Sequence, residues 1–297
     1  MIKLRMGIER NSLTPKQQHI YLSPHLDDAI LSCGGLIHRQ RAAGEPVIVI
    51  TLCAGSPNYS RLSPFAQQYH AAWGNLPDPV ASRRAEDRTV LGRWGVTAHH
   101  CNTLDSLYRR VDGKVAYPDL AALFGEPHPQ ERDTLPRLWQ QELESLPSNP
   151  AGATIYAPLA IGNHVDHQLV RVLALRLIND GWRIWFYEDY PHVERSGALQ
   201  AAQAWFGSVF WRARTIPIDV NAKIAAIRGY KTQVPFVFGD ERAMVRRVKQ
   251  FTAETACDIS LVERIRRRLA RAGGRRERLW RAVLGYHAHA ERIWRLA

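Results

Sequence analysis

The chain has 297 residues, of which 45% are hydrophobic and 23% are charged. This composition excludes a disordered protein, and the length is sufficient for one large α/β domain with or without an appendage. Lys and Arg number 40 against 28 Asp and Glu, so the formal charge of +12 favours anionic partners or substrates without identifying one.

The N-terminal segment and the cysteines indicate in which cellular compartment the protein is expected. Residues 1–18 lack the uninterrupted apolar region of a signal peptide, and no stretch of the sequence reaches the length of a membrane span. The cysteines form no CxxC pair, so their spacing predicts neither a thiolate zinc site nor a disulfide framework; they are Cys33, Cys53, Cys101 and Cys257. We expect a cytoplasmic protein without a transmembrane segment.

The first strand and the first helix enclose a turn rich in metal-binding groups. Residues 20–22 predict a short buried strand, and apolar residues at helical spacing over 29–41 predict a helix. The turn between them contains His25, Asp27 and Asp28. One Asp could simply cap the helix, but two adjacent carboxylates are costly unless they share a cation or a proton. Since ligands of open α/β sheets bind at the carboxyl ends of strands, this turn is a candidate cation site.

Strand and helix signals then alternate, which predicts βαβ units and a largely parallel sheet. We expect strands over residues 46–53, 97–104, 153–157 and 182–187, and helices over residues 80–94, 130–146 and 168–179. The Gly-, Pro- and Ser-rich residues 54–78 predict a long loop beside the site. Residues 205–218 predict an additional antiparallel strand, and the chain is expected to be mainly helical beyond Val220.

A second group of metal-binding residues follows the strand at 153–157. The loop after it delivers His164, Asp166 and His167 at the start of a helix. An HxxH pair alone is a weak signal, but its position after a strand brings it to the same sheet edge as the first turn. Two histidines and one carboxylate leave coordination positions open for water and substrate, as in catalytic zinc sites.

These two motifs resemble those of a known family. PHLDD at residues 24–28 and HVDH at residues 164–167 are similar to the signature motifs of the PIG-L or LmbE-like deacetylases. The resemblance continues through Arg83, Glu86 and the Trp94-Gly95-Val96 turn to Asp105, whereas Leu26 and Ala29 depart from the common pattern. The resemblance implies a Rossmann-like three-layer α/β sandwich with a bound zinc ion. It also implies an enzyme that removes an acyl group, typically acetyl, from an amino sugar.

The resemblance also implies a role for each residue of the two motifs. His25, Asp28 and His167 match the metal ligands, and Asp27 matches the general base that later donates its proton to the departing amine. His164 matches the histidine that stabilises the transition state, and Asp166 would orient it and balance its charge.

Four further residues are candidates for substrate binding: Arg83, Asp105, Glu188 and Asp189. Arg83 could instead pair with Glu86 or Asp87 on its own helix, and Asp105 could cap a loop. Glu188 and Asp189 end the fifth strand, so we expect them at the same sheet edge as the metal.

The C-terminal segment is strongly basic. Nine arginines lie between residues 264 and 281, and apolar positions mark one helix face among them. We interpret the segment as the solvated face of a docked helix, with contact to an anionic surface such as a membrane, or to a phosphate-bearing substrate, as the alternative. The expected organisation is therefore a deacetylase domain over residues 1–257 and a basic helical extension over 258–297, with no nucleic-acid motif.

The combined prediction is hydrolysis of the N-acyl group of an amino sugar or an amino-sugar conjugate, a small molecule that can be anionic. The expected cofactor is Zn²⁺ or another divalent ion such as Fe²⁺. Two alternatives stay open: a non-haem iron oxygenase that uses the same His, Asp and His ligands, and a non-enzymatic binder of anionic polymers. An additional Asp and His for proton transfer favour hydrolysis.

Overall fold

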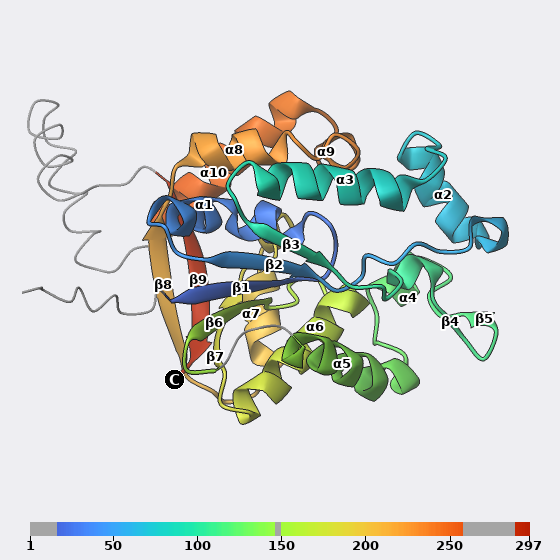
Figure 1. Ribbon diagram of the computed structural model, residues 1–297, viewed down its shortest axis with the longest axis horizontal. Coiled ribbons are helices and arrows are strands. Elements are labelled where there is room, and N and C mark those ends of the chain that lie inside the picture. The colour runs from blue at the N-terminus through green and yellow to red at the C-terminus, as the bar shows by residue number, and fades with distance from the viewer. Residues whose placement is uncertain (1–16, 146–149, 258–288) are drawn as a thin grey trace, which may run out of the picture.

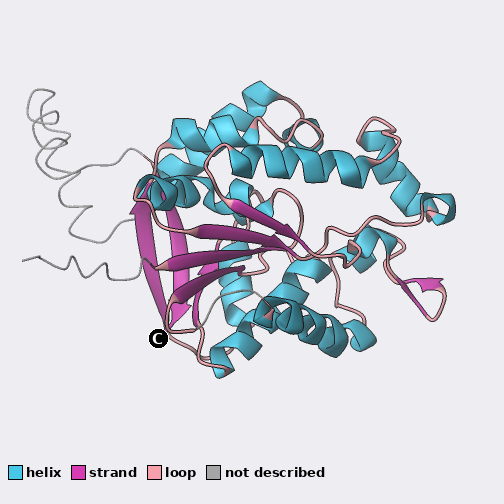
Figure 2. Ribbon diagram, viewed as in Figure 1, coloured by secondary structure: helices cyan, strands magenta, loops and turns pink. Residues whose placement is uncertain are grey.

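A seven-stranded sheet forms the centre of the molecule and separates two layers of helices (Figures 1 and 2). The structure is a computed structural model that describes residues 17–145, 150–257 and 289–297. The strand order is β3-β2-β1-β6-β7-β9-β8. The predicted fold class, a three-layer α/β sandwich with a largely parallel sheet, is confirmed.

Five strands run parallel and match the predicted strands closely. They are β1 (Gln18–Ser23), β2 (Val47–Thr51), β3 (Thr97–His100), β6 (Ala153–Pro158) and β7 (Arg183–Tyr187). All six residues of β6 are buried, as expected for a central strand covered by helices on both faces. The carboxyl ends of β1 and β6, which pair with each other, lie at one edge of the sheet.

The helices on one face are α1 (Asp28–Ala42), α3 (Pro79–Gly92), α8 (Val220–Ile227), α9 (Gln233–Phe238) and α10 (Glu241–Cys257). The other face is covered by α5 (Pro129–Glu144), α6 (Val165–Asn179) and α7 (Ala198–Ala204). Each layer packs its own cluster of buried hydrophobic side chains, aliphatic and aromatic, against the sheet, so the core lies on both faces of the sheet.

Shorter elements surround the carboxyl edge of the sheet. They are α2 (Pro64–Ala72), α4 (Leu120–Leu123), the 3-10 turns η1 (Tyr59–Arg61), η2 (Ser106–Tyr108) and η3 (His192–Glu194), and the hairpin strands β4 (Arg110–Val111) and β5 (Lys114–Val115). The expectation of one long loop over residues 54–78 is wrong. The Ser63 side chain accepts a hydrogen bond from the Ala66 amide at 3.1 Å, and Pro64 occupies the first turn, so capping starts a helix there.

The C-terminal region is only partly helical. The helices α8, α9 and α10 confirm the prediction for residues beyond 220, and the arginine-rich residues 264–281 lie outside the described residues. However, Ala290–Leu296 forms strand β9, which pairs antiparallel with β7 and with β8 (Trp211–Pro217). The expected helical extension is therefore wrong at its end, where the chain returns to complete the sheet. In the described ranges, no helix combines the length and apolar character that crossing a membrane would require.

A buried ion pair connects β9 to α1, the helix that begins at the first turn. Glu291 accepts hydrogen bonds from the Gly35 and Leu36 amides at 3.0 and 2.7 Å. The Lys223 ammonium of α8 donates to Glu291 at 2.6 Å and to the Ser32 carbonyl at 3.1 Å. Gly35 permits this close packing, because a Cβ there would lie 2.6 Å from the Ile218 side chain.

Candidate active site

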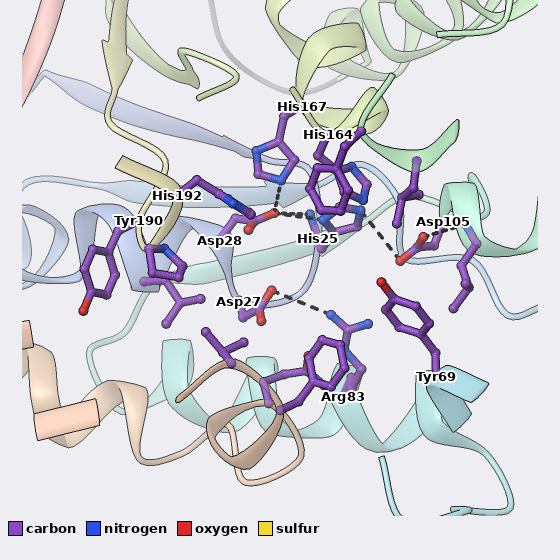
Figure 3. Close-up of a pocket in the computed structure, with 18 of the residues that line it drawn as sticks. His25, Asp27, Asp28, Tyr69, Arg83, Asp105, His164, His167, Tyr190 and His192 are labelled. Carbon is purple, nitrogen blue, oxygen red and sulfur yellow. Dashed lines mark hydrogen bonds and ion pairs between the residues drawn. The ribbon is translucent and has the colours of Figure 1, made fainter. Parts of the chain in front are cut away.

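The first turn places two carboxylates at the carboxyl end of β1 (Figure 3). Asp27 occupies the N-cap position of α1, yet its side chain makes no capping hydrogen bond. The Asp28 Oδ2 atom accepts a hydrogen bond from the His25 amide at 2.8 Å, which fixes the turn. The capping interpretation therefore does not account for Asp27, whose carboxylate faces the cavity.

The second turn begins α6 earlier than the sequence predicts, at Val165 rather than Gln168. His164 is the N-cap residue, and its Nδ1 atom accepts a hydrogen bond from the Asp166 amide at 3.2 Å. The loop before it holds Ala160 and Asn163 at φ values of 61° and 62°. Such left-handed backbone is unfavourable for residues other than glycine, so the fold stores local strain next to this motif.

The two turns meet at one carboxylate oxygen. Asp28 Oδ2 lies 3.1 Å from Nδ1 of His25 and 3.3 Å from Nε2 of His167. The opposite ring nitrogens contact outer carboxylates: His25 Nε2 lies 3.0 Å from Asp166, and His167 Nδ1 lies 2.6 Å from Asp189. Metal-binding histidines are typically backed by carboxylates in this way, so the donor set fits a divalent ion.

His164 offers a second choice of ligands. Ring nitrogens of His25, His164 and His167 all lie within 4.8 Å of one another, and all three side chains are buried. Geometry alone therefore brings together both the predicted set of His25, Asp28 and His167 and a three-histidine set.

The outer carboxylate Asp166 is held by groups that the motif does not contain. It is fully buried, and it accepts hydrogen bonds from Arg109 Nη1 at 2.5 Å and from the Ser106 amide at 3.0 Å. Arg109 in turn donates two hydrogen bonds to the Glu131 carboxylate, at 2.8 and 3.1 Å. Burial alone would raise the pKa of Asp166, but the charges of Arg109 and His25 lower it well below its usual range.

This arrangement contradicts the expected Asp166–His164 pair. The Asp166 carboxylate contacts His25, and only its backbone amide hydrogen-bonds the His164 ring. Burial and the neighbouring His25 lower the pKa of His164 well below its usual value, which favours a neutral ring. Because Nδ1 of His164 is an acceptor, the ring proton belongs on Nε2.

Besides His25, three more titrating groups of the site have strongly perturbed pKa values. Burial and the charge of Asp28 raise the pKa of Asp27 to about 6. Burial would raise the pKa of Asp28 also, but His167 and His25 lower it well below its usual range. For His167, burial opposes the charged form, yet Asp28 and Asp189 raise its pKa to about 9. Groups perturbed in this way and gathered in a cavity are typical of catalytic sites.

A cavity of about 450 Å³ opens above these residues. Arg83 lines it, with Nη2 3.7 Å from Asp27 and the guanidinium 5.0 Å from the Trp73 ring centroid. Neither of the helix neighbours proposed for Arg83 is its partner, since Glu86 accepts from Thr232 and Asp87 pairs with His100 at 2.8 Å.

The structure confirms the capping interpretation of Asp105, and its contact with substrate stays a prediction. Its Oδ1 atom caps η2 by accepting from the Leu107 amide at 2.9 Å, and its Oδ2 atom lies 3.7 Å from His25 Nε2 at the cavity wall. It therefore stays a candidate for substrate contact.

Glu188 and Asp189 follow β7, but contrary to the prediction they do not line the cavity. Glu188 accepts hydrogen bonds from Arg292 at 2.5 Å and from the Trp294 indole at 2.8 Å, both on β9. Asp189 supports His167 and accepts from the Ile161 amide at 2.9 Å. The predicted substrate contacts of both residues are wrong, because the fold commits these carboxylates to internal partners.

Comparison with known proteins identifies relatives of the chain. The family model described as PIG-L, GlcNAc-PI de-N-acetylase, matches residues 20–178. A 2'-N-acetylparomamine deacetylase of Niallia circulans is 30% identical over 242 residues, covering 76% of this chain and 84% of that protein. A second 2'-N-acetylparomamine deacetylase, from Streptomyces fradiae, is 26% identical over 229 residues, covering 75% and 72%.

Solved structures show the same fold. The zinc-inhibited form of the teicoplanin deacetylase Orf2 superposes with a TM-score of 0.70 at 24% identity, over 94% of this chain and 98% of that one. The A40926 pseudoaglycone deacetylase Dbv21 gives a TM-score of 0.66 at 21% identity, over 95% and 98%. With the family model covering more than half of the sequence and both motifs meeting at one cavity, this chain belongs to the PIG-L family of deacetylases.

Proposed function

We propose that this protein hydrolyses the N-acetyl group of an amino sugar that forms part of a larger glycoconjugate, with a divalent metal ion as cofactor and Zn²⁺ as the first candidate. The curated relatives act on an N-acetylated amino-sugar compound, which supports the reaction class. The observation that carries the proposal is the convergence of His25, Asp28 and His167 on one point, beside an Asp27 carboxylate that is not used for capping.

The site suits a metal ion because ring nitrogens of His25 and His167 both lie close to the Asp28 Oδ2 atom. His25, Asp28 and His167 would hold the ion, and Asp166 and Asp189 would fix the two rings from behind. When bound, the ion would polarise the acyl oxygen and make a water molecule more acidic.

Asp27 and His164 supply the proton chemistry in this proposal. A carboxylate with a pKa of about 6 is ionised at neutral pH, yet basic enough to accept a proton from the attacking water. Asp27 then returns that proton to the departing amine. His164, which carries its proton on Nε2 and lines the cavity, donates a hydrogen bond to the oxyanion as a neutral ring.

Amine release from N-acetylglucosamine and from 2'-N-acetylparomamine tests the proposal directly. We expect amine to appear with Zn²⁺ and to disappear when a chelator is added, with activity restored by metal. A matched control is Asp219→Asn, because Asp219 caps α8 and does not line the cavity. Absence of amine release with every divalent ion tried, from a folded protein, would contradict the proposal.

A further inference from the structure

Away from the cavity, three side chains at the outer edge of the sheet bring together nitrogen, sulfur and oxygen donors. They belong to His99, Cys101 and Glu142, and one donor atom of each lies within 4.8 Å of the other two. None of the three residues lines the cavity at the candidate active site. Within the described residues, neither Cys33 nor Cys53 belongs to such a group, so the arrangement is particular to Cys101.

Strand β3 presents His99 and Cys101 on one face. The strand lies at one end of the sheet, and its pairing with β2 includes His99. The Cys101 amide continues this pairing by donating to the Thr51 carbonyl at 2.9 Å. Side chains alternate along a strand, and the intervening His100 lies on the opposite face, 2.8 Å from Asp87 of α3. Backbone pairing therefore holds the first two donors in place.

Helix α5 supplies the third donor from an anchored position. Trp139 is buried, and its indole donates a hydrogen bond to the Thr103 hydroxyl at 2.9 Å. Glu142 follows Trp139 by three positions, which is close to one helical turn, so both lie on the side of the helix that meets β3. The Glu142 Oε1 atom is 3.2 Å from His99 Nε2. These two side chains are 39% and 32% exposed, so the group is open to solvent on one side.

The donor types match those of a zinc site. Zn²⁺ binds imidazole nitrogen, thiolate sulfur and carboxylate oxygen, and three protein ligands leave its fourth tetrahedral position for water. Mg²⁺ and Ca²⁺ prefer oxygen ligands, so the sulfur disfavours them. Without an ion, burial and the nearby Glu142 raise the pKa of the Cys101 thiol to about 12, so the thiol keeps its proton. A bound ion would displace that proton to solvent.

We propose that His99, Cys101 and Glu142 form a second metal site, separate from the active site, that binds one Zn²⁺ ion with water as the fourth ligand. The ion would connect the edge strand β3 to α5 and close the intervening segment into a loop, which stabilises the fold. That segment carries Asp105 at the cavity wall and Arg109 behind the site. The inference does not rest on the proposed function, because it uses none of the active-site residues.

Cobalt absorption tests this site with a readout that the active site does not give. Co²⁺ replaces Zn²⁺ in tetrahedral sites, and a cobalt–thiolate bond absorbs in the near ultraviolet, whereas the proposed active-site ligands contain no sulfur. We expect Co²⁺ to produce this absorption band in metal-free wild-type protein and Zn²⁺ to remove it. The band should be lost in Cys101→Ser. His99→Ala should weaken the Kd for Co²⁺ about tenfold or more, since even outer groups of metal sites contribute on that scale.

Three further variants control the measurement. Cys33→Ala is the matched control, because Cys33 is a buried cysteine outside the group, and it should keep the band. His25→Ala should also keep the band, which separates this site from the active site. Glu142→Gln changes a partly exposed side chain and should weaken Co²⁺ binding even if Cys101→Ser does not fold.

Thermal unfolding tests the stabilising role. Measured in His25→Ala, which removes a proposed active-site ligand, Zn²⁺ should raise Tm, and the rise should vanish when Cys101→Ser is added. Absence of the band from wild-type protein at micromolar Co²⁺, or a band of unchanged strength in both Cys101→Ser and Glu142→Gln, would overturn the site. An equal Tm rise with and without Cys101→Ser would overturn its role in stability.

Discussion

Two regions of the molecule bury clusters of opposite charge, and they differ in how those charges are satisfied. At the C-terminal edge, Glu291 is closed off by Lys223 and by two amides of α1. At the carboxyl edge of β1 and β6, Asp28 shares one oxygen with two histidine rings, and Asp27 faces a cavity. In the first cluster every charge is paired within the protein, which indicates a structural role. The second keeps groups directed at a ligand, which indicates chemistry.

The largest expected effect is on turnover at the cavity. Asp27→Asn removes the base but none of the proposed metal ligands, so kcat should fall about 10²–10⁴-fold while the metal content stays unchanged. Steady-state kinetics together with elemental analysis measures both quantities. Turnover within a factor of two of wild type would assign the base to another residue.

The next effect concerns the oxyanion donor. His164→Ala should lower kcat about 10²–10³-fold, because one fixed hydrogen-bond donor in a buried site contributes on that scale. KM should change far less than kcat, since the donor acts mainly on the charge that develops during reaction. A variant whose KM rises while kcat is retained would show that His164 binds substrate instead.

In the structural cluster the expected effect is on stability rather than chemistry. Glu291→Gln leaves the buried Lys223 ammonium without its carboxylate, so the free energy of unfolding should fall by about 3–5 kcal/mol. Urea denaturation measures this loss. The kcat of the protein that stays folded should be close to that of wild type. A loss below about 1 kcal/mol would show that water or another group replaces the carboxylate.

A smaller loss of stability is expected from a change at Glu188, where β9 pairs with β7. Glu188→Gln keeps the shape of the side chain but weakens its hydrogen bonds to Arg292 and Trp294, so unfolding should become easier by about 1–3 kcal/mol. The KM for substrate should be unchanged, because Glu188 does not line the cavity. A selective rise in KM with normal stability would restore the original prediction that Glu188 binds substrate.

Local patterns made the core of the fold and the two motifs predictable. The apolar runs of β2 and β6 specify buried strands, and PHLDD and HVDH each occupy a few consecutive residues. Strand alternation then places both turns at one sheet edge, because parallel strands end together.

Contacts between distant residues were not predictable in the same way. Arg109 holds Asp166 across 57 positions, and Glu188 meets Trp294 across 106. Nothing near Arg109 in the sequence marks it as a support of the site. Strand β9 follows an arginine-rich segment whose composition favours a helix, whereas its place is decided by pairing with β7 and β8.

The most direct test of the account is the metal content of single variants at the cavity. A second group of metal-capable side chains, formed by His99, Cys101 and Glu142, could bind zinc independently, so the measurement is best made in a Cys101→Ser background. After dialysis against Zn²⁺, elemental analysis should find one ion per chain in that background and in its His164→Ala derivative. It should find little in the derivatives His25→Ala, Asp28→Ala and His167→Ala. Stoichiometric zinc in all three, or loss of zinc in His164→Ala with retention in Asp28→Ala, would contradict the assignment and favour the three-histidine set.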